Sequence, residues 1–426
     1  MNLPPAIGAA LVFALGGAVA GLLGRRKLGG FVFPAWVLTF VTAAMVWPRA
    51  FDTWMGIDLK NLMVPLVQVI MFGMGTKLSA GDFVRVFVVP KPVMIGLFLH
   101  YTVMPLSGYA LARLFGFPPE IAAGLVLVGS VSSGTASNVI AYLAGGNVAL
   151  AVTITACSTL VSPFLTPLLM QVLAGRMVTI DFLKMMLEIL NMVIVPVAAG
   201  LAANRVLYGG RPWSNRAGPL GWLAGGCALA AAAMALAPAA GLGAWATLRG
   251  GAVVGSALIG LVALAKLALS VLARRPNTWM DRALPLVSMA AICLIVAIIM
   301  ARSRDKLLVV GGALILAAML HNAIGYLLGY WLARALHLDE TTCRTIAIEV
   351  GMQNGGMATG LAMSVLKSAD AALAPAIFGS WMNISGSMLA GWWRRRPVPA
   401  LAPAPLGAAS RRTRLRIETQ SDQPRN

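Results

Sequence analysis

The chain has 426 residues, of which 59% are hydrophobic and 11% are charged, and its mean hydropathy is +0.83. A soluble domain carries about 25% charged residues, so this composition excludes an ordinary soluble protein and predicts an all-α polytopic membrane protein. The net charge of +19 would suggest nucleic acid as a partner in a soluble chain. Here the basic residues fall in short loops and at the C-terminus, as the positive-inside rule requires, so we expect the lipid bilayer and no nucleic acid.

Thirteen apolar runs are each long enough to cross about 30 Å of hydrocarbon as a helix. The first run, 6–23, precedes Arg25, Arg26 and Lys27, the reverse of the order in a secretory signal. We interpret residues 1–27 as an extra N-terminal span. The other runs lie at 29–47, 61–76, 92–114, 121–143, 148–173, 183–206, 219–240, 250–273, 284–301, 307–333, 343–366 and 371–393.

The basic residues of the loops predict an orientation, because cytoplasmic loops carry an excess of Lys and Arg. Starting from a cytoplasmic loop at Arg25, the pattern holds for the loops around Lys77, Arg211 and Arg274 and for the tail from Arg394. Three basic residues are exceptions on the outer side: Arg302, Arg304 and Lys306. We predict a multi-pass protein of the cell (inner) membrane, with the N-terminus outside and the C-terminus in the cytoplasm.

Two polar segments, Ser132 to Asn138 and Glu349 to Asn354, interrupt the fifth and twelfth apolar runs. An ionised carboxylate near the bilayer centre costs about 3 kcal/mol on insertion scales. Glu349 therefore needs a helical partner, a bound cation or water, and Gly355 and Gly356 favour a helix break beside it. Two interrupted membrane helices indicate the ion and substrate site of a secondary transporter.

The two interrupted runs hold matching places in two five-span units. The first unit is 28–176, and the second begins with a helix in 177–210 and continues in 284–393 after an inserted two-span segment, 211–283. A five-span unit repeated in tandem inverts in the membrane, and an inserted pair keeps that parity. We therefore predict inverted five-helix repeats. Residues 394–426 are rich in Pro, Ala and Arg and are predicted to form a disordered basic tail.

Several segments, in this order along the chain, resemble the bile acid:sodium symporter family. They are Met71 to Gly75, Gly134 to Asn138, Asn147 to Leu150, His321 to Gly329, Glu349 to Asn354 and Asn383 to Ser387. The resemblance covers about 29–206 and 284–393. It implies a core domain and a panel domain, two crossed broken helices and alternating access. It also implies sodium-coupled uptake of a small organic anion, such as a carboxylate or a bile acid, with Na⁺ as coupling ion, no organic cofactor and no enzymatic activity.

Carried over residue by residue, the resemblance implies two sodium sites and a substrate site. The first sodium site takes oxygens from Ser137, Asn138, Thr155 and Glu349. The second takes Glu349, the backbone carbonyls of Val350 and Met352, and Gln353, with His100 where the family has a glutamine. Thr135, Asn354 and Asn383 fall at positions that line the substrate cavity, where half-helix N-termini offer positive ends. No other metal is implied.

The sequence departs from the family pattern at three of these places. Ala151 replaces a serine of the first sodium site, which leaves a water or Ser133 as its substitute. His100 is a poor sodium ligand, and an imidazole titrates near neutral pH. Met382 replaces a histidine beside the substrate, which predicts a less polar pocket. A proton carried by His100 or Glu349 in place of one sodium, giving a proton-coupled anion transporter, is therefore an alternative.

Two further classes of protein fit parts of the sequence. A substrate sensor on the same fold predicts binding without flux. An intramembrane enzyme is disfavoured. Ser132-Ser133-Gly134 faintly resembles a serine-protease loop, with His100 or His321 as base. No GxSG, HExxH or paired-Asp motif accompanies it, and an enzyme of this kind leaves Glu349 unexplained. The four cysteines stand singly, which predicts neither a disulfide nor a metal framework. The sequence does not predict the oligomeric state.

Overall fold

The computed structural model describes residues 5–24, 32–237, 243, 245–274, 276 and 279–396. Helices dominate it, as the composition predicts. They are α1 (Pro5–Gly24), α2 (Val32–Val46), α3 (Met63–Gly75), α4 (Ala80–Val88), α5 (Pro90–Leu114), α6 (Pro119–Ser130), α7 (Ala136–Leu143), α8 (Val148–Ala174), α9 (Phe182–Ile189), α10 (Val195–Tyr208), α11 (Ala217–Leu236), α12 (Trp245–Lys266), α13 (Trp279–Arg302), α14 (Arg304–Ala335), α15 (Glu340–Gly351), α16 (Gly355–Ser364) and α17 (Ala369–Arg394). The π-helix η4 (Leu190–Ile194) joins α9 to α10, and η6 (Leu267–Leu272) continues α12.

Seven helices in the described part of the chain are long and apolar enough to cross a membrane. They are the helices at Pro90–Leu114, Val148–Ala174, Phe182–Tyr208, Ala217–Leu236, Ala246–Leu272, Trp279–Arg302 and Arg304–Ala335. The chain is thus a multi-pass, all-α membrane protein, whereas the count of thirteen spans stays a prediction. Most of the predicted basic tail, residues 397–426, lies outside the described residues.

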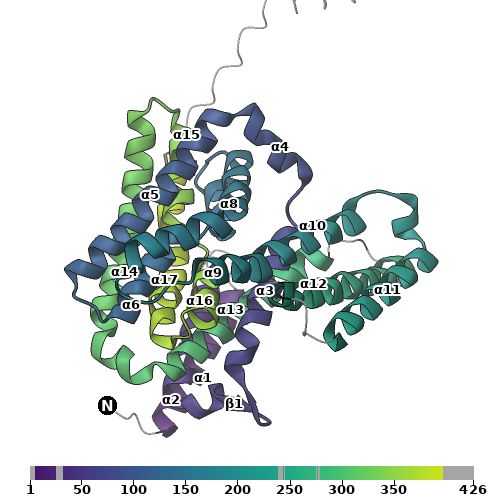
Figure 1. Cartoon of the computed structure of the whole chain (residues 1–426), viewed down its shortest axis with the longest axis horizontal. Coiled ribbons are helices and arrows are strands. Elements are labelled where there is room, and N and C mark those ends of the chain that lie inside the picture. Colours follow the sequence, from purple (N-terminus) through teal and green to yellow (C-terminus); the bar gives the residue numbers. More distant parts are fainter. Residues whose placement is uncertain are drawn as a thin grey trace, which may run out of the picture.

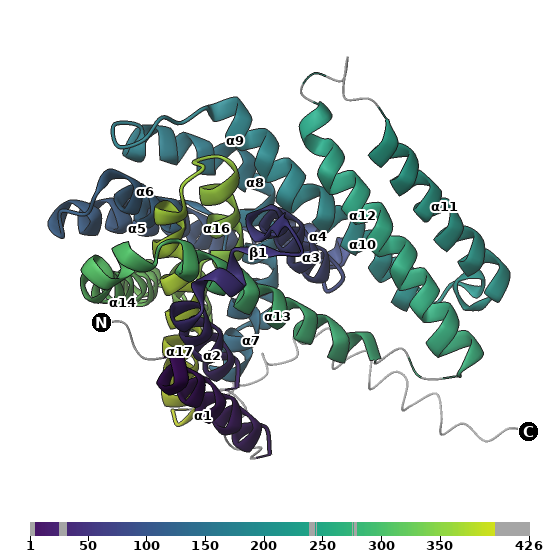
Figure 2. The same cartoon turned by 90° about the horizontal axis from the view of Figure 1, so that it is seen from below.

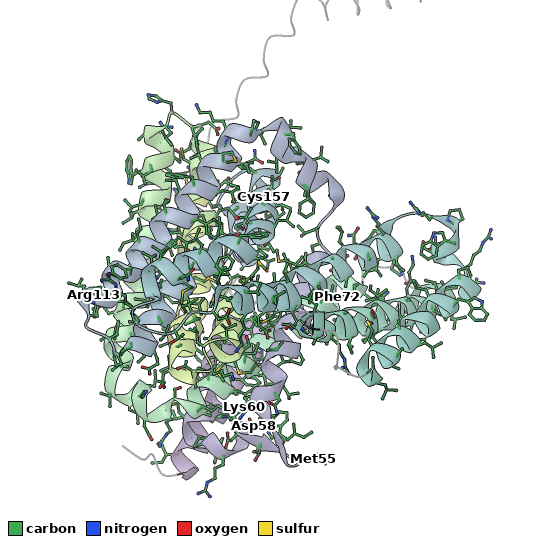
Figure 3. All side chains as sticks on the ribbon, in the orientation of Figure 1. Met55, Asp58, Lys60, Phe72, Arg113 and Cys157 are labelled. Carbon is green, nitrogen blue, oxygen red and sulfur yellow. The ribbon has the colours of Figure 1, made fainter. Side chains whose placement is uncertain are left out.

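A small hairpin that the apolar pattern did not predict connects α2 to α3. Its strands are β1 (Thr53–Trp54) and β2 (Ile57–Asp58), and Met55 and Gly56 between them have φ angles of 50° and 83°. Positive φ at both central residues is the geometry of a two-residue hairpin turn. Figure 3 shows Met55 at the tip of the loop, with Asp58 and Lys60 nearby.

Basic residues that the loop pattern did not expect form ion pairs. Arg302, at the end of α13, pairs with Asp52 (2.6 Å) and with Asp58 of the hairpin region. Lys306, at the start of α14, pairs with Asp370 at the start of α17.

The helices form a main bundle with a hairpin of helices at its edge. In Figures 1 and 2, α11 and α12 lie at one side of the molecule, apart from α5, α6, α14 and α17. The pair α11 and α12 contacts the bundle through α10 and α3, and Phe72 lies buried at this junction (Figure 3). Lys266 of α12 is buried there and donates to the carbonyl oxygens of Val206 (2.7 Å) and Leu207 (3.3 Å) at the end of α10. A cation suits this position because the last carbonyls of a helix carry negative charge.

Within the bundle, close helix contacts depend on small residues. A Cβ at Gly124 of α6 would collide with the carbonyl oxygen of Ala371 on α17. Such contacts let the backbones of membrane helices approach closely, which replaces the hydrophobic driving force that a lipid solvent does not provide. The helices α5, α6, α8, α14, α15 and α17 pack on one another in this way, while α2, α3 and α13 pack together beside them.

Candidate functional site

The two predicted polar breaks lie side by side in the fold. The segment between α6 and α7 pairs antiparallel with the segment between α15 and α16, with Ser133 opposite Gln353. The Gly134 N–H donates to the Met352 carbonyl (3.1 Å), and the Asn354 N–H donates to the Ser132 carbonyl (2.9 Å). Each break thereby satisfies backbone groups of the other, which a membrane interior otherwise leaves unpaired at high cost. We call this pairing the crossing.

Glycine is required in the segment of the crossing between α6 and α7. A Cβ at Gly134 would stand 2.6 Å from the carbonyl oxygen of Gln353, a backbone atom that has no side-chain freedom to move away. The close approach of the two segments therefore depends on the absence of a side chain at this position.

The Glu349 carboxylate, at the end of α15, lies fully buried at the crossing. Its Oε1 accepts a hydrogen bond from Ser137 Oγ (2.5 Å), and its Oε2 accepts from Thr155 Oγ1 and from Ser133 Oγ (both 2.8 Å). Thr155 Oγ1 also lies 3.4 Å from Asn138 Oδ1. Among the described residues, no basic side chain pairs with this carboxylate.

The structure thus brings together all four residues expected for the first sodium site, and three different helices contribute them. Ser137 and Asn138 lie in the first turn of α7, Thr155 lies in α8, and Glu349 lies in the last turn of α15. Ala151, one turn before Thr155, is buried and supplies no side-chain oxygen. The additional hydroxyl comes instead from Ser133 in the crossing itself.

The residues expected for the second sodium site also lie at the crossing. His100 of α5 is fully buried, with Nδ1 3.0 Å from the Glu349 carbonyl oxygen and Nε2 2.9 Å from that of Val131. Gln353 Nε2 donates to the Val350 carbonyl (2.8 Å), while Gln353 Oε1 is buried and has no hydrogen-bond partner.

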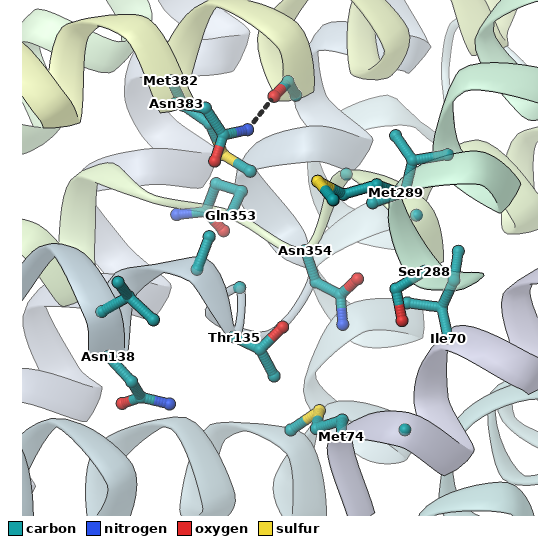
Figure 4. A pocket seen from close by; sticks show the side chains of 18 of the residues that line it. Ile70, Met74, Thr135, Asn138, Ser288, Met289, Gln353, Asn354, Met382 and Asn383 are labelled. Carbon is teal, nitrogen blue, oxygen red and sulfur yellow. Dashed lines mark hydrogen bonds between the residues drawn. The ribbon is translucent and has the colours of Figure 1, made fainter. Parts of the chain in front are cut away.

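A cavity of about 560 Å³ opens beside the crossing (Figure 4). Thr135, Asn354 and Asn383, the three residues expected to contact substrate, all line it. Most of its wall is apolar, with methionines from three helices: Met71, Met74, Met289 and Met382. Of the lining residues in the described part of the chain, Lys77 alone is charged.

The cavity wall includes exposed as well as buried side chains. Lys77, which follows α3, and Leu143, which is 40% exposed, both line it. Its lining residues Val296 and Thr359 are 4% and 3% exposed.

Two helix N-termini border the cavity at the crossing. Thr135 immediately precedes α7, and Asn354 caps α16 by accepting a hydrogen bond from the Met357 N–H (3.0 Å). The positive end of each helix dipole, together with backbone N–H groups of the first turn, favours an anion in this position.

Sequence reasoning missed part of the cavity wall. Ser288 of α13 lines it, and no motif marked that helix. Ser380 and Ser387 of α17 also line it, three residues before and four after Asn383. This spacing places the three on one helical face, so a polar stripe in an otherwise apolar run was a signal that could have found them.

Comparison with known proteins points to transport. Residues 64–224 match the profile of the Sodium Bile acid symporter family. The chain is 33% identical over 374 residues to an uncharacterized sodium-dependent transporter, YocS, of Bacillus subtilis, covering 87% of this chain and 94% of that protein. It is 28% identical over 363 residues to the probable sodium/metabolite cotransporter BASS1, chloroplastic, of Arabidopsis thaliana, covering 85% of this chain and 73% of that protein. The protein of the same name from Oryza sativa subsp. japonica is 29% identical over 394 residues, which cover 90% of this chain and 79% of that protein.

Proposed function

This chain belongs to the Sodium Bile acid symporter family, and from that premise we propose that it couples sodium influx to the uptake of a small organic anion by alternating access. The relatives are named sodium-dependent or sodium/metabolite transporters, which supports sodium as the coupling ion and a transporter rather than an enzyme. The anion and the transport cycle belong to the proposal.

One observation carries it. A buried carboxylate, Glu349, accepts hydrogen bonds from three hydroxyl groups and has no basic partner among the described residues. Hard cations prefer oxygen ligands. A hydroxyl can rotate its proton away and offer a lone pair instead, so Ser133, Ser137 and Thr155 can change from donors to the carboxylate into ligands of a cation. We assign the first sodium site to Ser137, Asn138, Thr155 and Glu349, with Ser133 as an additional ligand.

The chemistry of the cavity favours an organic anion with an apolar body. Methionines and other apolar side chains supply most of the wall, and the two helix N-termini supply the positive ends for a carboxylate. We assign Thr135, Asn354 and Asn383 to substrate contact. The amide and hydroxyl groups of the wall fix orientation without adding charge.

The proposed cycle moves a core against a panel. The core consists of α5 to α8 and α14 to α17, and the panel of α2, α3, α9 to α10 and α13; the cavity lies between α3 and α13 on one side and the crossing on the other. In the predicted orientation Lys77, which lines the cavity, is cytoplasmic. Sodium at Glu349 stabilises the crossing that presents the anion site, and coupling is the binding free energy that the two ligands share.

The finer architecture is part of the same proposal. Residues 28–176 form the first inverted repeat, and the second combines 177–210 with 284–393. The span in 1–27 and the segment 211–283 are additions to the two repeats, which makes thirteen spans in the inner membrane.

Thermal unfolding of purified protein tests the ion. The melting temperature in sodium chloride, compared with potassium and choline chloride at equal ionic strength, should rise saturably with sodium because a ligand of the folded state stabilises it by mass action. A panel of carboxylates added in sodium should then give further shifts. Equal melting temperatures in all three salts would contradict the proposal.

A further inference from the structure

We infer that this chain binds one sodium ion, because His100 supplies no oxygen where a second sodium site needs one, and its ring nitrogens lie against two backbone carbonyls. The inference deepens the proposed function and rests on it. It makes His100 the residue that sets the number of coupling ions.

The backbone oxygens expected for a second site already accept hydrogen bonds. The Val350 carbonyl accepts from Gln353 Nε2 at 2.8 Å, and the Met352 carbonyl accepts from the Gly134 N–H at 3.1 Å. The Glu349 carbonyl lies 3.0 Å from His100 Nδ1. A carbonyl oxygen has two lone pairs, so these hydrogen bonds do not by themselves exclude a cation, and the oxygen that is missing is the one that the side chain at position 100 would supply.

The two sites differ in the oxygens that their side chains supply. Around the Glu349 carboxylate the donors are hydroxyls, which can turn their protons away and offer lone pairs to a cation. At the second position the Val350 carbonyl accepts from the Gln353 amide, and the Met352 carbonyl accepts from the Gly134 N–H and lies 3.2 Å from Ser133 Oγ. The side chain at position 100 adds an imidazole ring there and no oxygen.

Packing surrounds the His100 ring. The ring lies between the carbonyl oxygens of Glu349, in the last turn of α15, and Val131, in the segment between α6 and α7. Its neighbour Tyr101 packs edge-on against it, with ring centroids 4.9 Å apart, and the Tyr101 hydroxyl donates to the Ser158 carbonyl at 2.6 Å. The imidazole therefore occupies the space between α15 and the first segment of the crossing.

One oxygen remains free at this place. Gln353 Oε1 is buried and has no hydrogen-bond partner, but a single neutral oxygen does not replace the several oxygen ligands that a hard cation needs. A glutamine at position 100 would remove the ring and bring a second amide oxygen to the crossing. His100→Gln is therefore expected to create the site that the wild type lacks.

Binding of ²²Na⁺ to the purified, full-length protein in detergent, measured by scintillation proximity at saturation, tests the inference. We expect one sodium per chain in the wild type and two in His100→Gln. His321→Gln is the matched control, because His321 is also fully buried and has a ring nitrogen 2.8 Å from a carbonyl, that of Met104, in a different part of the bundle. The His321→Gln variant should still bind one sodium per chain.

Each alternative outcome is decisive. Two sodium ions per wild-type chain would overturn the inference while leaving sodium coupling intact, and this count needs no variant to fold. One sodium in a folded His100→Gln would overturn the role of His100. No sodium bound by the wild type would overturn the proposed function itself.

Discussion

Replacing Glu349 by glutamine removes one charge from the crossing and keeps the size of the side chain. In the wild type the carboxylate accepts from Ser137, Thr155 and Ser133 at 2.5, 2.8 and 2.8 Å. The glutamine oxygen still accepts from these hydroxyls, and its amide can donate to one that rotates. Removing the charge also removes its desolvation cost, so we expect the free energy of unfolding in the absence of sodium to change by no more than about 2 kcal/mol.

The effect on sodium should be much larger. A sodium ion among these oxygens lies within about 4 Å of the carboxylate, where two unit charges attract by about 4 kcal/mol at an effective dielectric constant of about 20. At about 1.4 kcal/mol per tenfold change, Kd for sodium should rise about 1,000-fold. A stabilisation of about 2.7 kcal/mol, reached at 100 times the wild-type Kd, should then fall to nearly zero.

The assay is the melting temperature in sodium against choline chloride, for wild type, Glu349→Gln and Glu120→Gln. Glu120 lies in the first turn of α6, outside the cavity wall, so the same substitution there should keep the full sodium shift. A sodium shift that survives in Glu349→Gln would refute the assignment of this carboxylate to the ion. Loss of folding in that variant would instead support a structural role.

Three further variants test other parts of the structure. Ser133→Ala should raise Kd for sodium about tenfold, the value of one hydrogen-bonding oxygen, as measured by the sodium dependence of the melting temperature. Gly134→Ala should destabilise the protein by about 1–3 kcal/mol through collision at the crossing, whereas Gly312→Ala, where a Cβ meets nothing within 4 Å, should not; denaturant or thermal unfolding separates them. The pKa of Asp58 is held below its usual value, chiefly by the Lys60 side chain, so its ionised form contributes stability at neutral pH that is lost as pH falls through that lowered pKa. Asp58→Asn should therefore flatten the acid side of the stability profile, and an unchanged profile between pH 3 and 7 would contradict this.

The sequence predicted the helices well because long apolar runs have few alternatives in a membrane. The runs at 92–114 and 148–173 match α5 and α8 almost residue for residue. The break at Glu349 to Asn354 was predicted from the cost of burying Glu349 and the amides beside it, and the break at Ser132 to Asn138 from a polar run inside an apolar one. Two interrupted helices indicated a shared site, but their crossing was expected only from the family resemblance, since no local pattern encodes a contact over more than 200 residues.

Hydrogen bonds between side chains and backbone atoms could not be predicted from the sequence. His100 was expected as a side chain facing a cation, but its ring nitrogens lie against the carbonyls of Glu349 and Val131. Every residue has a carbonyl, so composition gives no signal for such a contact. The pairing of Arg302 with Asp52 and Asp58 was missed for a related reason: the hairpin that presents these carboxylates is set by turn geometry, in a segment with little hydrophobic pattern.

Sodium-driven accumulation in proteoliposomes tests the central claim most directly. The protein is reconstituted, and uptake of the radiolabelled carboxylate that gives the largest sodium-dependent melting shift is followed with an inward sodium gradient or with choline outside. Coupled transport predicts transient accumulation above the external concentration with the sodium gradient only, and its loss in Glu349→Gln. Equal uptake in both media, or sodium-dependent binding without any accumulation, would contradict it.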